Sequence, residues 1–138
     1  MRRDPRAEAE RWLVQARDEF EDADALRRRR RYYLALFHFQ QAAEKALKAF
    51  LYLTCPFEEV FFTHSLYELL EMAKAVDSRF REVEQAARLD QYYIPTRYPN
   101  GLPGGVPSRF YTDPREAREA MRLARAVLEM VEAHFRAA

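Results

Sequence analysis

The sequence of 138 residues is poor in residues that cross-link a chain or interrupt regular structure. It contains one cysteine, Cys55, and three glycines, all between residues 101 and 105. A single cysteine excludes an internal disulfide framework, and without a partner thiol it fits no common zinc motif. We interpret Cys55, beside Pro56 in an apolar context, as an inert thiol. The scarcity of glycine predicts long regular elements with few turns.

The sequence also lacks an excess of one charge and a long apolar run. With 23 basic and 22 acidic residues, its net charge is +1, so no overall field attracts nucleic acid or an anionic membrane. No stretch of about 18 uncharged apolar residues is present, and the beginning, MRRDPRAEAERW, lacks the apolar segment of a signal peptide. These absences predict a cytoplasmic protein without membrane contact. The length suits one domain spanning residues 1–138.

What the chain does contain is helical periodicity. Apolar residues recur at helical spacing and predict helices over about residues 5–29 and 32–53, a short third helix from Ser65, a fourth from Ser78 and a last from Pro114. Short connections between amphipathic helices favour antiparallel neighbours. We therefore predict an all-α fold: an antiparallel bundle of about five helices, four long or medium and one short.

The fourth helix and the segment after it differ in pattern. An α-helical spacing would turn Phe80, Val83, Ala87, Leu89 and Tyr93 inward. Residues 94–113 hold four prolines and all three glycines and show no helical period. This segment is predicted to be a loop, with partial order contributed by its aromatic and arginine side chains.

The predicted helix 32–53 is the centre of the pattern, with apolar residues over more than half its circumference. A polar stripe remains, formed by Gln41, Glu44, Lys45 and Lys48 at i, i+3, i+4 and i+7. The stripe could face a ligand, with the lysines meeting phosphate and Gln41 fixing orientation. It could equally be a solvated set of ion pairs on a half-exposed helix. The residues alone leave both interpretations open.

A second candidate cluster lies at the start of the loop, around Arg97 and Tyr98. Further aromatic and arginine residues lie on either side of this pair: Tyr92, Tyr93, Arg109, Phe110 and Tyr111. Arginine beside aromatic rings can hold a phosphate with its fork and a base by stacking. The same residue types also anchor loops and dominate protein interfaces. Nucleotide binding and partner contact therefore both remain open here.

Several kinds of chemistry have no motif in this sequence. No glycine-rich phosphate loop is present, and His38, His64 and His134 form no HxxxH or HExxH pair, so we expect no metal and no cofactor. The run Arg27–Arg31 lies where the first predicted helix ends. Five adjacent arginines on a helix would point in every direction, so we interpret the run as solvated surface in preference to a nucleic-acid patch.

Three segments together resemble a known family. They are FHFQQAAEKALKAFL at residues 37–51, THSLYELL at 63–70 and YYIPTRYPNG at 92–101, and in this order they are similar to a prokaryotic branch of the HEPN domains. The resemblance implies a bundle of about five helices, a homodimer or higher homo-oligomer, a possible nucleotide ligand and a minimal nucleotidyltransferase as partner in a toxin-antitoxin or defence setting. The positions it marks are Gln41, Glu44, Lys45, Lys48, His64, Arg97, Tyr98 and Pro99.

One departure from the family bears on catalysis. Many active HEPN proteins are metal-independent ribonucleases with an Arg and a His separated by four to six residues late in the bundle, and no such pair follows Arg97 here. Arg31 and His38 have the spacing, but at the start of the second predicted helix. The resemblance therefore favours a binding protein without catalysis of its own and leaves enzymatic activity open. Weak catalytic candidates are Arg31, His38 and His64, and RNA as a ligand stays open.

Two alternatives follow from these residues. The first is a ribonuclease in which His38 or His64 performs acid-base chemistry while an arginine stabilises the developing phosphorane charge. The second is a structural role, in which Tyr98, Phe110 and Tyr111 hold two copies together.

Overall fold

The computed structural model describes residues 4–54, 60 and 62–137. The longer helices are α1 (Pro5–Arg28), α2 (Tyr32–Thr54), α3 (Leu66–Val76), the 3-10 helix η2 (Ser78–Tyr92) and α5 (Pro114–Ala137), and the short ones are η3 (Pro99–Gly101) and α4 (Pro107–Phe110). The described residues contain no strand. The prediction of an all-α bundle is confirmed, whereas Cys55 lies outside the described residues.

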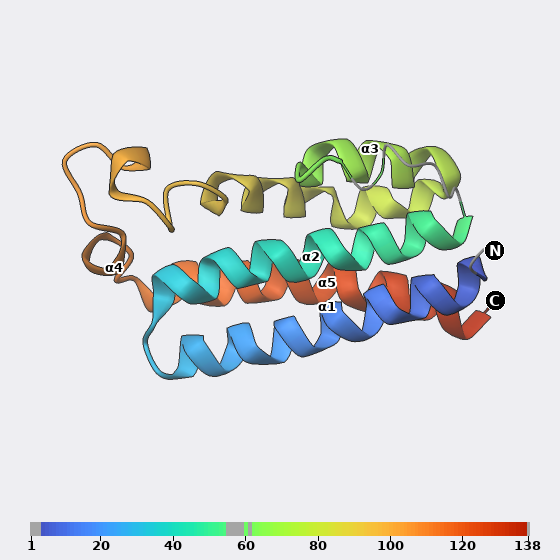
Figure 1. Ribbon diagram of the computed structural model, residues 1–138, viewed down its shortest axis with the longest axis horizontal. Helices are drawn as coiled ribbons and strands as arrows, with labels where there is room; N and C mark the ends of the chain where they lie inside the picture. Colours follow the sequence, from blue (N-terminus) through green and yellow to red (C-terminus); the bar gives the residue numbers. More distant parts are fainter. Residues whose placement is uncertain (1–3, 55–59, 61, 138) are drawn as a thin grey trace.

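Helix α2 is the central member of this bundle (Figure 1). It packs against α1, α3, η2 and α5, so neighbours cover it on several sides. Its side chains Leu36, Phe39, Leu47 and Phe50 are fully buried. Burial of such large apolar side chains contributes about 1.5–3 kcal/mol each to folding. The apolar rows of the 32–53 stretch thus form the centre of the core, as their pattern predicts.

The turn between α1 and α2 covers residues 29–31, so the first helix ends one residue earlier than the sequence predicts. α1 ends at Arg28, and the backbone of Arg30 has a φ of 63°, in the left-handed region. Arg31 then precedes α2, with its amide N bonded to Leu26 O at 2.9 Å. Arg31 therefore lies outside both helices and shares no helical face with His38, although the two residues have the family's spacing.

The ends of α1 and α3 carry the caps that their sequences predict. Asp4 accepts a hydrogen bond from Arg6 N at 3.0 Å, and Ser65 Oγ accepts one from Glu68 N at 3.2 Å. Each bond satisfies an amide that the first turn of a helix leaves without an intrahelical partner. The cap at Ser65 fixes where α3 begins and so holds the adjacent His64.

Helix η2 corrects the predicted inward face of the fourth helix. Its buried side chains recur every three residues; they are Phe80, Val83, Ala86, Leu89 and Tyr92. A 3-10 helix has three residues per turn, so residues three apart lie on one face. The α-helical spacing assumed from the sequence was wrong for two positions, because Ala86 and Tyr92 replace Ala87 and Tyr93 on the inner face.

The segment 94–113 consists of turns, η3 and α4. It is anchored by Thr96 and Tyr111, both buried. The Thr96 hydroxyl donates to Tyr92 O at 2.5 Å, and the Tyr111 ring meets the Tyr92 ring edge-on at 6.0 Å. Partial order in this segment is therefore confirmed.

α5 begins at Pro114 after the expected cap, because Asp113 accepts a hydrogen bond from Arg115 N at 2.9 Å. Helical spacing in the sequence predicts an inner row of six residues, and all but Met121, which is only half-buried, are buried: Ala117, Ala124, Leu128, Val131 and Phe135. α5 crosses behind α2 in Figure 1 and closes the core on that side.

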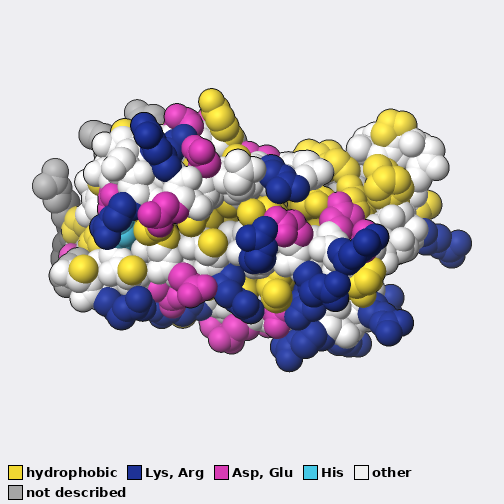
Figure 2. Space-filling view, turned by 180° about the vertical axis from the view of Figure 1, so that it is seen from behind, with side chains coloured by type: hydrophobic (Ala, Val, Ile, Leu, Met, Phe, Trp, Pro, Cys, Tyr) yellow, Lys and Arg dark blue, Asp and Glu magenta, His cyan; other side chains and the backbone are white. Residues whose placement is uncertain are grey.

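The surface mixes both charges. The face in Figure 2 shows basic and acidic side chains interspersed, while hydrophobic side chains gather at the end of the molecule away from the termini. No helix in the described part of the chain combines the length and apolar character that crossing a bilayer requires.

Candidate functional site

The polar stripe of α2 is organised around two carboxylates. The first belongs to Glu19 of α1, which is buried at the seam between α1 and α2. It lies 2.8 Å from His38 Nδ1 and 2.5 Å from Lys45 Nζ. Burial alone would raise the pKa of Glu19, but the hydrogen bonds from His38 and Lys45 outweigh it and hold the pKa below the ordinary value. Glu19 is therefore ionised at neutral pH and holds both His38 and Lys45 in place.

The second carboxylate is Glu44 of α2. Glu44 Oε2 lies 3.0 Å from Lys48 Nζ and 3.1 Å from His64 Nδ1. The Glu44 and Lys48 side chains are only 4% and 3% exposed, whereas the His64 side chain is 53% exposed. The spacing of Glu44 and Lys48 would also suit a solvated surface pair. In the folded protein the two side chains instead form a buried ion pair with the exposed imidazole of His64 attached, because α1 and α3 pack against α2.

Two neighbouring amides join these carboxylates into one network. Gln41 Nε2 donates to Glu44 Oε1 at 3.4 Å, and its Oε1 accepts from Lys45 Nζ at the same distance. Gln41 Nε2 also donates to Gln40 Oε1 at 2.7 Å. Gln40 is fully buried, so its amide is fixed by the protein on every side. The stripe is consequently one connected set of hydrogen bonds.

The carboxylate of Asp90 in η2 holds the start of α3, close to His64 in the chain. Its carboxylate accepts hydrogen bonds from Leu66 N at 2.8 Å and Tyr67 N at 3.1 Å, the first amides of α3. Gln40 Nε2 adds bonds to Asp90 Oδ1 at 3.3 Å and to His64 O at 3.1 Å. A negative charge at a helix N-terminus is favourable because unpaired amides and the helix dipole both point at it. The backbone of His64 is thereby fixed against α2.

Arg97 lies within a group of three aromatic rings. Its guanidinium carbon is 4.5 Å from the centroid of Tyr93, 4.8 Å from Phe37 and 5.0 Å from Tyr98. Nε donates to Tyr93 O at 2.7 Å. Among the described residues no carboxylate pairs with this guanidinium, and no acceptor binds its two terminal nitrogens. The aromatic faces attract the cation and fix its plane without neutralising its charge.

Tyr93 connects this arginine with His64. The His64 and Tyr93 rings stack with centroids 5.3 Å apart and planes 17° from parallel. Both residues line a cavity of about 390 Å³ together with Phe62, Thr63, Ser65 and Asp90. An exposed imidazole, a tyrosine ring and an unpaired guanidinium therefore lie next to one another.

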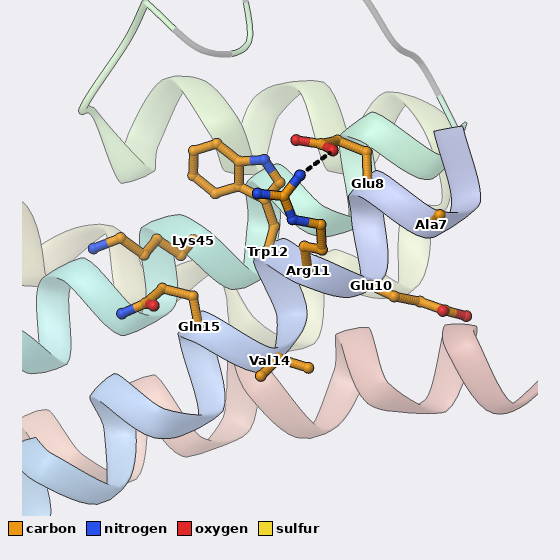
Figure 3. Close-up of a pocket in the computed structure, with 8 residues that line it drawn as sticks. All are labelled: Ala7, Glu8, Glu10, Arg11, Trp12, Val14, Gln15 and Lys45. Atoms are coloured by element: carbon orange, nitrogen blue, oxygen red, sulfur yellow. Dashed lines mark hydrogen bonds and ion pairs between the residues drawn. The ribbon is translucent and has the colours of Figure 1, made fainter. Parts of the chain in front are cut away.

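Lys45 and His38 border the other side of the network. A hollow of about 740 Å³ along α1 includes Trp12, Gln15 and Lys45. In Figure 3 the Trp12 indole rises from α1 and Lys45 extends from α2 beside Gln15. A smaller cavity of about 280 Å³ adjoins Gln15, Glu19 and His38.

His134 lies apart from these residues, on α5. Its ring is stacked on Phe80 at 5.6 Å and tilted against Phe50 at 4.6 Å. Nε2 is 2.9 Å from Asp77 Oδ2 but without the alignment of a hydrogen bond. Hydrogen bonding to Arg79 lowers the pKa of Asp77 to about 2.

The structure brings most of the marked residues together and leaves one out. Gln41, Glu44, Lys45, Lys48 and His64 belong to the network. Arg97 and Tyr98 reach it through Tyr93. Exposed Pro99 begins η3.

Arg31 does not join His38, whose Nδ1 is bound to Glu19. Glu19, Gln40 and Asp90 are members that the sequence reasoning missed. Gln40 could have been found as the first glutamine of the QQAAEKALKA block, but nothing local marks Glu19 or Asp90.

The arrangement has a definite chemical capacity. Both His38 and His64 direct Nδ1 to a carboxylate. A carboxylate at Nδ1 fixes the ring and leaves Nε2 as the atom that can meet a ligand or carry a proton. In the described residues no group of three or more His, Cys, Asp or Glu side chains could hold a metal ion.

Comparison with known proteins gives a family match and two similar crystal structures. The model described as HEPN domain matches residues 9–134. TT1696 from Thermus thermophilus is 39% identical, with a TM-score of 0.80 over 91% of this chain and 96% of that one. ST0689, an archaeal HEPN homologue, is 32% identical, with a TM-score of 0.74 over 98% of this chain and 99% of that one. Comparison with curated proteins found no match.

Proposed function

Because this chain belongs to the HEPN family, we propose that it binds a nucleotide, with the phosphate on Arg97 and the remainder against His64 and Tyr93. The observation that carries the proposal is the guanidinium of Arg97, which is held by Phe37, Tyr93 and Tyr98 and has no carboxylate partner among the described residues. A guanidinium fork that is already oriented loses little freedom on meeting a phosphate.

The proposed binding site does not use every residue of the polar stripe directly. Glu44 and Lys48 are buried and paired with each other, so in this proposal they hold His64 and do not touch the ligand. Lys45 is engaged by Glu19 on the α1 side. Direct contacts to the nucleotide therefore come from His64, Tyr93 and Arg97. Gln41 connects the Glu44 and Glu19 groups through its hydrogen bonds to Glu44 and Lys45.

The test is thermal unfolding with ATP, GTP and their monophosphates at about 1 mM. A dissociation constant of about 100 µM would stabilise the protein by roughly 1.4 kcal/mol at that concentration. We expect Arg97→Gln to remove this stabilisation, and His64→Asn to reduce it. Arg81→Gln removes an equal charge from an exposed position on η2 and should leave it intact. A ligand effect that survives Arg97→Gln would contradict the proposed site.

The second candidate function is metal-independent RNA cleavage. The observation favouring it is that Nδ1 of both His38 and His64 rests on a glutamate, which leaves each Nε2 available for proton transfer. Arg97 would then stabilise charge on the phosphorane. Cleavage in EDTA should fall by about 100-fold or more in His64→Ala or His38→Ala. Cleavage unchanged in both variants would exclude these bases.

A binding role in this family also fits a partner protein. We include in the proposal a homodimer and a small nucleotidyltransferase partner in a toxin-antitoxin or defence setting. Tyr98 and Phe110 are exposed and could contact a second copy, whereas Tyr111 is buried and could contribute only indirectly. Light scattering of the wild type and of Tyr98→Ala tests the dimer, and co-purification with the product of a neighbouring reading frame tests the partner. A wild-type protein that remains monomeric at about 100 µM would exclude the dimer.

A further inference from the structure

The end of the bundle away from the termini carries basic side chains that the nucleotide site does not use. Arg27 and Arg28 both pair with Asp24, at 2.8 and 3.4 Å. The three arginines that follow, Arg29 to Arg31, are exposed. Within residues 4–54, 60 and 62–137, no carboxylate forms an ion pair with any of these three. Asp24 is therefore occupied by Arg27 and Arg28, and the three arginines of the turn leave a concentrated positive charge.

The backbone of this turn holds one of the three arginines, Arg30, in a conformation that is unusual for a long side chain. Arg30 has a φ of 63°, a left-handed conformation that glycine and asparagine adopt at lower cost. An arginine at this position keeps a cation where the fold alone would favour a small residue. The turn thus carries three exposed cations along a short length of chain, an arrangement suited to several successive phosphates.

Helix α4 adds an aromatic ring to the same end. α4 packs against α2, and Figure 1 places it at the same end of the bundle as the turn between α1 and α2. Its Phe110 is 59% exposed, and Arg109 next to it is exposed without an ion-pair partner in the described residues. In Figure 2 dark blue and yellow side chains gather at this end. Positive charge and an accessible aromatic face thus occur together.

We propose that this surface, formed by Arg29, Arg30, Arg31, Arg109 and Phe110, binds single-stranded nucleic acid. The arginines contact consecutive phosphates, and Phe110 stacks on a base. A single strand satisfies both features, since its backbone is charged at every nucleotide and its bases are free to stack. The inference uses none of the residues that carry the nucleotide site.

The experiment is fluorescence anisotropy with labelled oligo(dT) and oligo(U) of 15 nucleotides over a range of salt concentrations. Four phosphate contacts predict that log K falls with log salt at a slope of about −3. The double variant Arg29→Gln/Arg31→Gln should weaken binding and reduce the slope to about −1.5. The control Arg81→Gln/Arg136→Gln removes the same charge from exposed positions on η2 and α5. It should retain the slope.

Phe110→Ala tests the stacking contact separately. It should weaken binding about 10-fold and leave the salt slope unchanged, because it removes no charge. Thermal unfolding of each variant verifies that the bundle is intact. Equal losses in the two double variants would overturn the proposal, as would unaltered binding by Phe110→Ala. So would binding to anionic lipid vesicles or polyglutamate without binding to either oligonucleotide. Tighter binding of oligo(U) than of oligo(dT) would identify RNA as the preferred nucleic acid, and the reverse order would identify DNA.

Discussion

Glu44 and His64, twenty residues apart in the chain, meet through Oε2 and Nδ1 at 3.1 Å. The carboxylate is almost fully buried, while the imidazole is half exposed. A core residue thereby sets the orientation of a surface ring. Any ligand that meets His64 Nε2 meets an atom positioned from the interior of the bundle, because the ring cannot turn without losing its bond to Glu44.

The buried pair of Glu44 and Lys48 should be costly to break. Lys48→Met leaves the Glu44 charge buried without its cationic partner on α2, with Gln41 and His64 still bonded to it, and we expect a loss of about 3 kcal/mol in the free energy of unfolding. Urea denaturation at pH 7 measures it. Lys74→Met, which breaks the surface pairs with Glu71 and Glu84, is the control and should cost much less. Similar losses in both variants would show that burial of the pair is unimportant.

Asp90 should stabilise the start of α3. Asp90→Ala removes the acceptor of the Leu66 and Tyr67 amides, so we expect a loss of about 1–2 kcal/mol. Hydrogen exchange should show faster exchange at these two amides. Asp18→Ala, at an exposed position on α1, should change neither quantity. Unchanged exchange in Asp90→Ala would rule out the capping role.

The lowered pKa of Glu19 predicts how stability depends on pH. A carboxyl group with a depressed pKa in the folded state contributes stability above its ordinary value of 4.5 and loses the contribution as pH falls through the folded pKa. Glu19→Gln should therefore be less stable than the wild type at pH 7, by about 1–2 kcal/mol. The difference should shrink towards pH 3. Urea denaturation at both pH values tests this, and a difference that grew on acidification would contradict the sign.

The three-residue repeat of η2 makes two adjacent alanines unequal. Ala86 is buried and Ala87 is half-buried. Ala86→Leu should overpack the interior and cost about 1–3 kcal/mol, whereas Ala87→Leu should cost less than about 0.5 kcal/mol. Chemical denaturation of the two variants compares them directly. The reverse order would favour the α-helical spacing that the sequence suggests.

The sequence by itself determined the helices and the core. Apolar spacing, the caps at Asp4, Ser65 and Asp113, and the prolines after Tyr93 act over a few residues, so they can be recognised in the chain. The QQAAEKALKA block and the RYP motif likewise pointed to the family and to the residues of the network. The inner face of η2 was misjudged because the helix type changes the period from about 3.6 to three residues per turn.

Only the tertiary structure decided which polar side chains are buried and which remain accessible. Glu44 and Lys48 have the spacing of a surface pair, yet α1 and α3 flank them. Glu19 and Asp90 carry no local mark, since their partners lie 19 to 50 residues away. The same holds for Arg97, whose cage needs Phe37 from α2. Contacts between distant segments depend on how helices pack, and helical periodicity describes one helix at a time.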